Sequence, residues 1–286
     1  MKLVVLGAAG QLGQVMTAQA RRQHTVVAWT RAEADITKPE VLAAALAAES
    51  PDAVINCAAY ARVDEAEDEP ENVFAINAWA IRDLARLATA QGFALVHYST
   101  DFVFDGLDAS PRHETDPVNP RGVYATSKLT GEWFAAETPA HYILRVESLF
   151  GGPAAKSSVD VLLNGLRAGR EVRAFADRTV TPSFVTDVAD ATLSLLERRA
   201  AHGLYHCVNS GHTTWVDLTH ELARLVGRPS SLVTPVNMAG LSMRVPRPLH
   251  AALANDKLRA AGIEMPGWQD ALARYVTNTQ SAVPRA

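Results

Sequence analysis

The chain has 286 residues, of which 48% are hydrophobic and 20% are charged, a balance typical of a globular protein and not of a disordered one. This length allows one large α/β domain, or a main domain with a smaller lobe. The formal net charge of −4 gives no general attraction to nucleic acid or to an anionic membrane. We therefore expect neither of these as a partner.

The amino terminus begins with a β-branched and leucine-rich run, residues 2–6, typical of a strand buried in a parallel sheet. A glycine-rich turn follows, and then a helical pattern to residue 22. In a strand–turn–helix of this kind the glycines allow a tight turn, close approach of a pyrophosphate, and packing of helix on strand. The alternative is a merely tight connection. The pattern predicts a dinucleotide site at Gly7, Gly10, Gln11, Leu12 and Gly13.

The second strand, residues 24–29, should end near the adenosine ribose of a bound dinucleotide. It leads into Arg31, and no carboxylate stands before Glu33. Arg31 is therefore a candidate for binding the 2′-phosphate of NADP(H), although it could equally be an ordinary surface arginine. Asp35 and Ile36 would flank the adenine, before a helix capped around Thr37. We expect NADP(H), with NAD(H) as the alternative.

A third strand, residues 52–56, is followed by small residues that let the cofactor lie close to the backbone. These further cofactor candidates are Cys57, Ala58, Ala59 and Tyr60. The acidic run at residues 64–69 is interpreted as a solvated helix face. The next helix begins at Pro70 and ends near residue 92, and it carries Asn77, a candidate to brace the neighbouring loop.

A fourth strand, residues 93–98, delivers Thr100 to the same edge of the sheet. If residues 122–137 form a helix, Tyr124 and Lys128 lie one turn apart on one face. A phenol titrates near 10, and a nearby ammonium should move its pKa toward neutral pH. Thr100 could then bind the oxygen that Tyr124 protonates. The alternative makes Tyr124 a packed aromatic and Lys128 a solvated helix residue.

The regular alternation of strand and helix breaks after a fifth strand, residues 140–146. A helix is expected at 158–167, a strand at 171–175, and a helix from about 187. Residues 204–209, a helix at 214–226 and the remaining tail are assigned to a smaller lobe, which would close over a substrate. The predicted fold is an α/β Rossmann-type doubly wound parallel sheet, residues 1–148, with a smaller C-terminal α/β substrate lobe. That lobe is residues 149–286, with part of the chain returning to the Rossmann domain.

The two cysteines, Cys57 and Cys207, lie in apolar runs that read as strands. Two buried thiols suit a reducing compartment, and they cannot build a disulfide framework or a metal site. The first apolar run, residues 3–6, is too short for a signal peptide, and no apolar stretch approaches the length of a membrane span. We expect a cytoplasmic protein with no membrane association and no bound metal.

Taken together, the motifs resemble those of the extended short-chain dehydrogenases/reductases, and within that group the dTDP-4-dehydrorhamnose reductase family. The likeness extends along nearly the full length. It is carried by residues 7–13, 56–67, 97–104, 124–132 and 203–206, and by Arg247-Pro248. It implies catalysis by Thr100, Tyr124 and Lys128, and NADPH-dependent reduction of a 4-keto nucleotide sugar, with dTDP-4-dehydro-L-rhamnose as the leading substrate. The implied substrate contacts are Val63, Thr100, Asp101, Phe102, Tyr124, Glu147, Ser148 and Arg247.

One departure from the family pattern follows Arg145. The reductases usually carry a Thr-Ser-Trp-like sequence there, whereas this chain has Glu147 and Ser148. We expect the change to remove stacking area and to add negative charge near an anionic diphosphate. The segment after Asp177 also lacks the usual glycine.

Two other functions stay open at this point. The chain could be a sugar-nucleotide epimerase or dehydratase that recycles its hydride, with Glu147 or Asp101 as the further acid–base residue. It could also be a regulatory subunit that binds NADP without chemistry, because one such subunit resembles the same reductases. The resemblance leaves a homodimer open as well.

Overall fold

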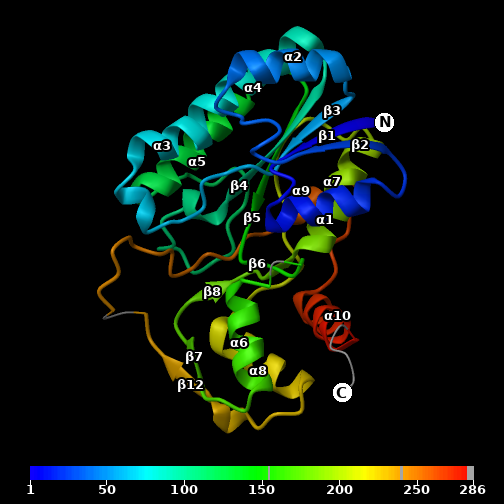
Figure 1. Ribbon diagram of the computed structural model, residues 1–286. Coiled ribbons are helices and arrows are strands. Elements are labelled where there is room, and N and C mark those ends of the chain that lie inside the picture. Colours follow the sequence, from blue (N-terminus) through cyan, green and yellow to red (C-terminus); the bar gives the residue numbers. More distant parts are fainter. Residues whose placement is uncertain (154, 239–240, 282–286) are drawn as a thin grey trace.

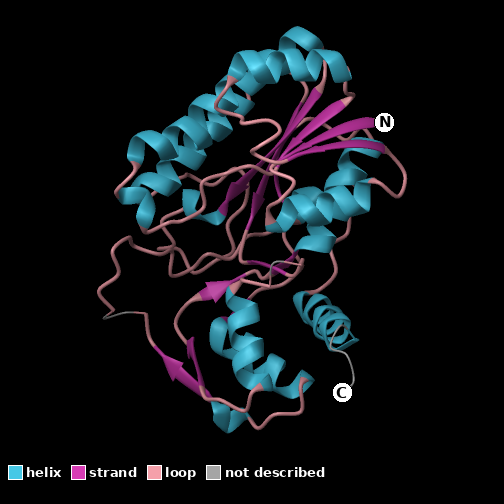
Figure 2. Cartoon of the chain, viewed as in Figure 1, coloured by secondary structure: helices cyan, strands magenta, loops and turns pink. Residues whose placement is uncertain are grey.

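The computed structural model describes residues 1–153, 155–238 and 241–281, and its centre is a six-stranded parallel sheet (Figures 1 and 2). The strand order is β10-β5-β4-β3-β1-β2. The strands are β1 (Lys2–Leu6), β2 (Thr25–Trp29), β3 (Ala53–Asn56), β4 (Ala94–Thr100), β5 (His141–Val146) and β10 (Gly203–His206). The Rossmann-type prediction is confirmed, and the first five strands begin and end within two residues of their predicted limits.

Helices cover both faces of this sheet because successive residues of a strand point to opposite sides. Val4 and Leu6 of β1 pack with helices on one face, and Leu3 and Val5 pack with helices on the other. The first face carries α2 (Pro39–Glu49), α4 (Ala80–Gln91) and α5 (Gly122–Ala135), and the second carries α1 (Gln11–Ala20) and α7 (Val185–Glu197). The short α3 (Pro70–Phe74) runs into α4 through a π-helical turn, Ala75–Trp79.

The sixth strand corrects one prediction. Residues 204–209 were expected in the smaller lobe, but β10 pairs in parallel with β5 in the main sheet, where Leu204 lies opposite Ile143. Helix α7 lies along α1 and brings the chain back to the open edge of the sheet (Figure 1). The βαβ rhythm was hidden because a segment of the smaller lobe is inserted between β5 and α7.

The smaller lobe lies beyond the carboxyl ends of the sheet strands (Figure 1). It contains α6 (Ser158–Arg167), α8 (Trp215–Leu225) and α10 (Trp268–Ser281), and α9 (Asp256–Ala260) packs back beside β10. Three two-stranded sheets support it: β6 (Leu149–Phe150) with β9 (Ser183–Phe184), β7 (Val172–Phe175) with β12 (Val233–Val236), and β8 (Thr179–Val180) with β11 (Thr213–Thr214). Single 3₁₀ turns occur at Glu65–Glu67, Asp101–Val103 and Ser230–Leu232.

The arrangement fixes where a ligand can lie. Strand order reverses between β1 and β3, and in open parallel sheets such a switch point opens a crevice at the carboxyl ends of the strands. The smaller lobe faces this crevice, and the segment after β12 returns along it (Figure 1). Within the described residues, no helix has the length and apolar character needed to cross a membrane.

Candidate active site

The turn after β1 is closed by backbone contacts that leave no room for side chains. Gly7 has a φ of +72°, and a Cβ built on it would lie 2.6 Å from the backbone nitrogen of Ala58. A Cβ on Gly13 would lie 2.2 Å from the carbonyl oxygen of Gly7. Helix α1 begins after Gly10, so its unpaired N–H groups open toward the crevice. This cradle fits a dinucleotide pyrophosphate, which needs close backbone approach and a helix N-terminus.

A cavity of about 260 Å³ extends from this cradle across the ends of β1, β2 and β3. Its lining residues are Gly7, Ala9, Gly10, Arg31, Ala34, Asp35, Ile36, Cys57, Ala58, Ala59 and Ile76. Eight of these were predicted for the cofactor, and Ala9, Ala34 and Ile76 were missed because small and apolar residues carry no chemical signal.

The other predicted cofactor residues of this region support the cavity from behind. Gln11 donates to the carbonyl oxygen of Gly151 (2.8 Å), and Leu12 is buried in the core. The phenol of Tyr60 donates to Glu69 (3.1 Å). The prediction for Asn77 is confirmed, because its amide binds both backbone groups of Tyr60 and the hydroxyl of Ser127. These contacts hold the loop after β3 in place.

Arg31 lies at the open end of the cavity, with 78% of its side chain exposed. It forms an ion pair of 3.4 Å with Asp35, whose carboxylate also accepts from the backbone and hydroxyl of Thr37 (3.0 and 2.7 Å). The carboxylate of Asp35 is held mainly by Thr37 and takes only the Nε–H of Arg31. The other N–H groups of the guanidinium can therefore bind an anionic group. Helix α2 begins one residue later than the predicted cap, after Lys38.

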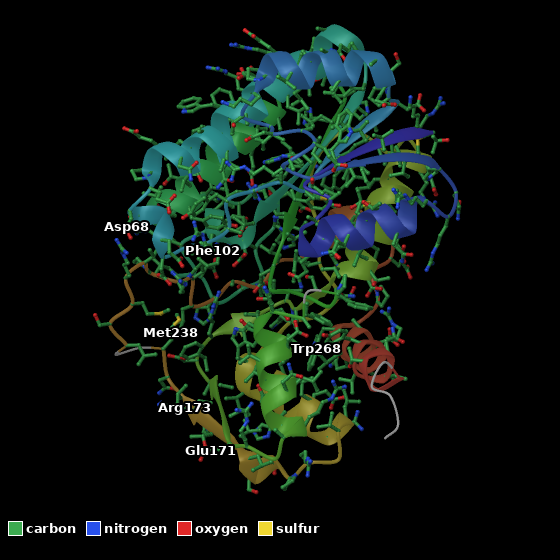
Figure 3. The ribbon with its side chains drawn as sticks, in the orientation of Figure 1. Asp68, Phe102, Glu171, Arg173, Met238 and Trp268 are labelled. Carbon is green, nitrogen blue, oxygen red and sulfur yellow. The ribbon has the colours of Figure 1, made fainter. Side chains whose placement is uncertain are left out.

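The predicted catalytic residues come from the ends of β4 and α5. The hydroxyl of Thr100 donates to Asp101 Oδ1 (2.9 Å) and accepts from the backbone N–H of Phe102 (3.2 Å). The ring of Phe102 meets the ring of Tyr124 edge-on, with 5.7 Å between centroids. Lys128, one turn further along α5, is buried and donates from Nζ to the carbonyl oxygen of Tyr98 (2.5 Å). Figure 3 shows Phe102 at the junction between the lobes.

The pKa of Tyr124 differs from the prediction. The pKa of Tyr124 is raised to about 12, chiefly by burial and also by the charge of Asp101, while the side chain of Thr100 acts in the opposite direction. Burial lowers the pKa of Lys128 to about 8. The prediction that Lys128 brings the pKa of Tyr124 toward neutrality is wrong, because burial has the largest influence on this pKa and Nζ of Lys128 binds Tyr98. Tyr124 is consequently a protonated phenol at neutral pH, which is the form that can donate.

A second cavity, of about 190 Å³, opens between the lobes beside Thr100. It is lined by Asp101, Phe102, Ser148, Leu149, Ser158, Val159, Arg178 and Trp215. Three predicted substrate residues are among them. Arg178 and Trp215 were missed because they come from distant segments, and a tryptophan at the start of an amphipathic helix is more often core. Val63 is half-buried in the turn before Glu65–Glu67.

Glu147 does not add the negative charge expected from its type. Its side chain is buried, and Oε2 accepts a hydrogen bond from the backbone N–H of Thr181 (2.6 Å). Burial raises its pKa well above the usual range, and the charge of Asp101 acts in the same direction. The neutral acid is therefore favoured, and Glu147 fastens the segment that follows β8 to the end of β5.

The acidic run before α3 is solvated as predicted, with Glu65 and Asp68 exposed, but some of its carboxylates also bind neighbouring segments. Asp64 pairs with Arg247 (2.6 Å), and Asp68 pairs with Arg244 on the segment that returns after β12. Figure 3 marks Asp68 beside this segment. Glu67 accepts from the backbone N–H of Val123 (2.7 Å) at the start of α5. Glu67 thus fixes the start of the helix that carries Tyr124, and Asp64 holds Arg247, whose guanidinium lies 5.8 Å from the ring centre of Phe102.

Comparison with known proteins agrees with this arrangement. The family model described as RmlD substrate binding domain matches residues 1–281. A probable dTDP-4,6-dihydroxy-2-methyloxan-3-one 4-ketoreductase of Streptomyces antibioticus is 33% identical over 95% of this chain and 93% of its own. A dTDP-4-dehydrorhamnose reductase of Burkholderia thailandensis is 32% identical over 98% and 100%.

Among solved structures, dTDP-4-dehydrorhamnose reductase of Bacillus anthracis in complex with NADP superposes with a TM-score of 0.91. It is 26% identical, and the match covers 97% of this chain and 99% of that one. Sequence and fold therefore agree over almost the whole length. The chain belongs to the RmlD substrate binding domain family, within the extended short-chain dehydrogenases/reductases.

Proposed function

We propose that the protein is an NADPH-dependent reductase of a 4-keto nucleotide sugar, with dTDP-4-dehydro-L-rhamnose as the first substrate to test. The observation that carries this proposal is the interaction of the Thr100 side chain with the phenol of Tyr124 at the edge of the sheet that bears the cofactor cradle, with the buried Lys128 one turn further along α5. The names of the relatives, a 4-ketoreductase and a dTDP-4-dehydrorhamnose reductase, support the same reaction.

The cofactor would be held by the cavity across β1, β2 and β3. Gly7 and Gly10 would admit the pyrophosphate to the α1 N-terminus, Asp35 and Ile36 would flank the adenine, and Arg31 would bind the 2′-phosphate that distinguishes NADP from NAD. The complex of the Bacillus anthracis reductase with NADP supports this choice. Gly13 and Leu12 set the position of α1, and residues 57–60 form the floor.

In the reaction, bound NADPH supplies the hydride to the keto carbon. Tyr124 donates its proton to the carbonyl oxygen. Thr100, whose one hydroxyl hydrogen points to Asp101 in the structure, would turn it to the same oxygen and stabilise the charge that develops there. Lys128 would supply a positive charge one helical turn along α5 from the phenolate left after proton transfer. Val63, Asp101, Phe102, Ser148 and Arg247 would bind the sugar and its diphosphate, while Glu147 orients the wall behind them.

A second candidate is an epimerase or dehydratase that returns the hydride to its substrate. The buried carboxyls of Asp101 and Glu147, both facing Arg178, favour it because such reactions need an acid–base group in addition to tyrosine. The two functions differ in cofactor balance. A reductase consumes one NADPH per sugar reduced, whereas an epimerase or dehydratase leaves the cofactor concentration unchanged.

The test is NADPH oxidation by the purified protein with enzymatically generated dTDP-4-dehydro-L-rhamnose, alongside NADH and a Tyr124→Phe control. Stoichiometric oxidation that disappears in the control supports the reductase. Conversion of the sugar without NADPH loss supports the second candidate. NADPH binding without any conversion supports a regulatory subunit, and it contradicts the proposal.

The family also supports finer expectations. Dinucleotide binding is assigned to residues 1–148 with the returning α7 and β10, and sugar binding mainly to the rest of residues 149–286. We expect a cytoplasmic enzyme. A homodimer is supported by Trp79 and Trp133, which expose 44% and 62% of their surface on the outer helices. Light scattering of the purified protein measures this directly, and a monomer at every concentration contradicts it.

A further inference from the structure

Trp215 is the first residue of α8, and its indole N–H lacks a partner. The residue is 7% exposed, and Nε1 is buried without a hydrogen bond to any group in the described ranges. Its backbone N–H bonds to the carbonyl oxygen of Arg178 (3.4 Å), which fixes the start of the helix beside β8. The ring forms part of the wall of the 190 Å³ cavity between the lobes. A buried donor is therefore held at a cavity that can admit a ligand.

Asp101 supplies the opposite kind of group to the same cavity. It is 4% exposed, and Oδ1 accepts from the hydroxyl of Thr100 (2.9 Å). Oδ2 is buried and has no hydrogen-bond partner within the part of the chain that the structure describes. Asp101 follows β4 in the main sheet, whereas Trp215 belongs to the smaller lobe. Two residues that line one cavity from the two lobes thus carry one unpaired acceptor and one unpaired donor.

The chemistry of a matching ligand follows from these two groups. Buried polar groups in folded proteins are almost always hydrogen-bonded, so a ligand that fits should satisfy both. The indole N–H needs an acceptor oxygen, and the free oxygen of Asp101 needs a hydroxyl donor. An apolar ligand would leave both unpaired, and a purely anionic one could pair with Arg178 in the same wall but would offer no donor to the carboxylate. A hydroxylated sugar ring carries both kinds of group.

We propose that Trp215 is a specificity-determining residue, whose indole N–H donates a hydrogen bond to an oxygen of the substrate's sugar ring while Asp101 accepts one from a sugar hydroxyl. This inference rests on the proposed function and names the residues that read the sugar. Asp101 is joined to Thr100, so its hydroxyl partner lies next to the reacting carbonyl. Trp215 contacts the ring from the other lobe, and the sugar therefore bridges the two lobes.

The test replaces Trp215 by Phe in the full chain, which keeps an aromatic ring and removes the N–H. With dTDP-4-dehydro-L-rhamnose we expect KM to rise about tenfold, the effect of one neutral hydrogen bond, with kcat within about twofold and KM for NADPH unchanged. The melting temperature without ligand should stay the same or rise, because the unpaired donor is gone. Trp268→Phe is the matched control, since Trp268 is also 7% exposed and lies at the start of α10 (Figure 3).

Binding separates the sugar from the nucleotide. The melting shift caused by dTDP-L-rhamnose should shrink in Trp215→Phe, while the shift caused by dTDP alone should equal that of the original protein. An unchanged KM, or an equal loss with dTDP alone, overturns the inference. A protein that binds dTDP-L-rhamnose without reducing any keto sugar contradicts the proposed reductase and leaves the role of Trp215 measurable by the melting shift.

A measurement on the unmodified chain guards against a folding defect in the variant. The chain has five tryptophans, so ¹⁵N-labelled protein gives few indole signals. One of them, assigned with single Trp→Phe variants, should move downfield with dTDP-L-rhamnose and stay in place with dTDP. Absence of such a shift at saturating ligand overturns the inference.

Discussion

The two halves of the crevice are built on different principles. On the cofactor side, the walls are short runs that follow β1, β2 and β3, and their fit depends on backbone atoms in near contact, as at Gly7 and Gly13. On the sugar side, Asp101, Glu147, Arg178 and Trp215 come from four distant segments, and three of them are ionisable groups. The fit of a ligand in the cofactor half depends on the space between backbone atoms. In the sugar half it depends on charge and hydrogen bonding.

This difference explains why the two halves should respond differently to substitution. A methyl group added at the cofactor cradle meets backbone that cannot move aside, so shape is lost whatever the chemistry. On the sugar side, a substitution of equal size can leave the shape intact and still change a proton or a hydrogen bond. Steric variants should therefore act on binding and stability in the first half, and isosteric variants should act on rate and pH dependence in the second.

The strongest test on the sugar side is Tyr124→Phe, which removes one oxygen and keeps the ring against Phe102. We expect turnover with the keto sugar to fall by about 10²–10⁴-fold, because the proton donor is gone, with NADPH affinity unchanged. Steady-state rates and NADPH fluorescence titration measure the two. Tyr142→Phe is the control, since its phenol bonds only to the carbonyl oxygen of Ala200 among the contacts described (2.7 Å). Near-normal turnover in Tyr124→Phe would remove the tyrosine from the mechanism.

The strongest test on the cofactor side compares Gly7→Ala with Gly169→Ala. Both glycines have positive φ, +72° and +67°, so both substitutions carry the same backbone cost of about 1–2 kcal/mol. Only Gly7 adds a clash, with Ala58, while a Cβ on Gly169 meets nothing within 4 Å. We expect Gly7→Ala to lower the free energy of unfolding by at least a further 1–3 kcal/mol, roughly the cost of overpacking, and to abolish tight NADPH binding. If urea titrations gave the same loss of unfolding free energy for both variants, the backbone around Gly7 would have moved aside to accept the added methyl group.

The same difference decided what could be predicted from the sequence. The cofactor side was largely predicted because its residues follow strands directly, and a glycine between strand and helix has a stated steric reason. The helix predicted at 122–137 begins at the predicted residue, and Tyr124 and Lys128 lie one turn apart in it. Local patterns are sufficient where neighbours in sequence are also neighbours in space.

The sugar side could not be predicted in the same way. Arg178 and Trp215 reach the cavity through pairing of β8 with β11, and a two-residue strand leaves almost no periodicity to detect. The ion pairs of the acidic run at residues 64–69 could not be predicted because the partners, Arg244 and Arg247, lie about 180 residues later. The predicted pKa shift of Tyr124 and the predicted charge of Glu147 were wrong for the same reason. Both depend on burial, which is set by the whole fold and not by the neighbouring residues in the sequence.

A smaller effect is expected at the rim of the cofactor side, where space is open. Arg31→Ala should raise KM for NADPH about tenfold or more and leave KM for NADH nearly unchanged, because only NADPH carries the 2′-phosphate. Steady-state kinetics with both cofactors measure this preference. Arg86→Ala is the control, since Arg86 is similarly exposed on α4. A parallel rise for both cofactors would mean that Arg31 shapes the adenine site instead of reading the phosphate.

The smallest effect, and the one that tests charge most directly, is the pH dependence of stability at Asp101. Burial raises its pKa to about 6, partly offset by Arg178 and Thr100, so the folded state holds this proton more tightly than the unfolded state does. The stability contributed by Asp101 is therefore present at low pH and is lost as pH rises from about 4 through about 6. Asp101→Asn should remove that loss.

Relative to the original protein, Asp101→Asn should thus gain free energy of unfolding between pH 4 and pH 7.5, on the order of 2 kcal/mol. Urea titrations at the two pH values measure the difference. Asp105→Asn should instead lower the free energy of unfolding at both pH values, because the backbone N–H of Leu107 and the amide of Asn119 lower the pKa of Asp105, whose carboxylate stabilises the fold above its unfolded pKa. Replacing two carboxylates four residues apart would then shift stability at pH 7.5 in opposite directions, because the buried one is opposed by desolvation and the half-buried one is supported by donors. The same sign for both would mean that the sugar cavity is as well solvated as the surface.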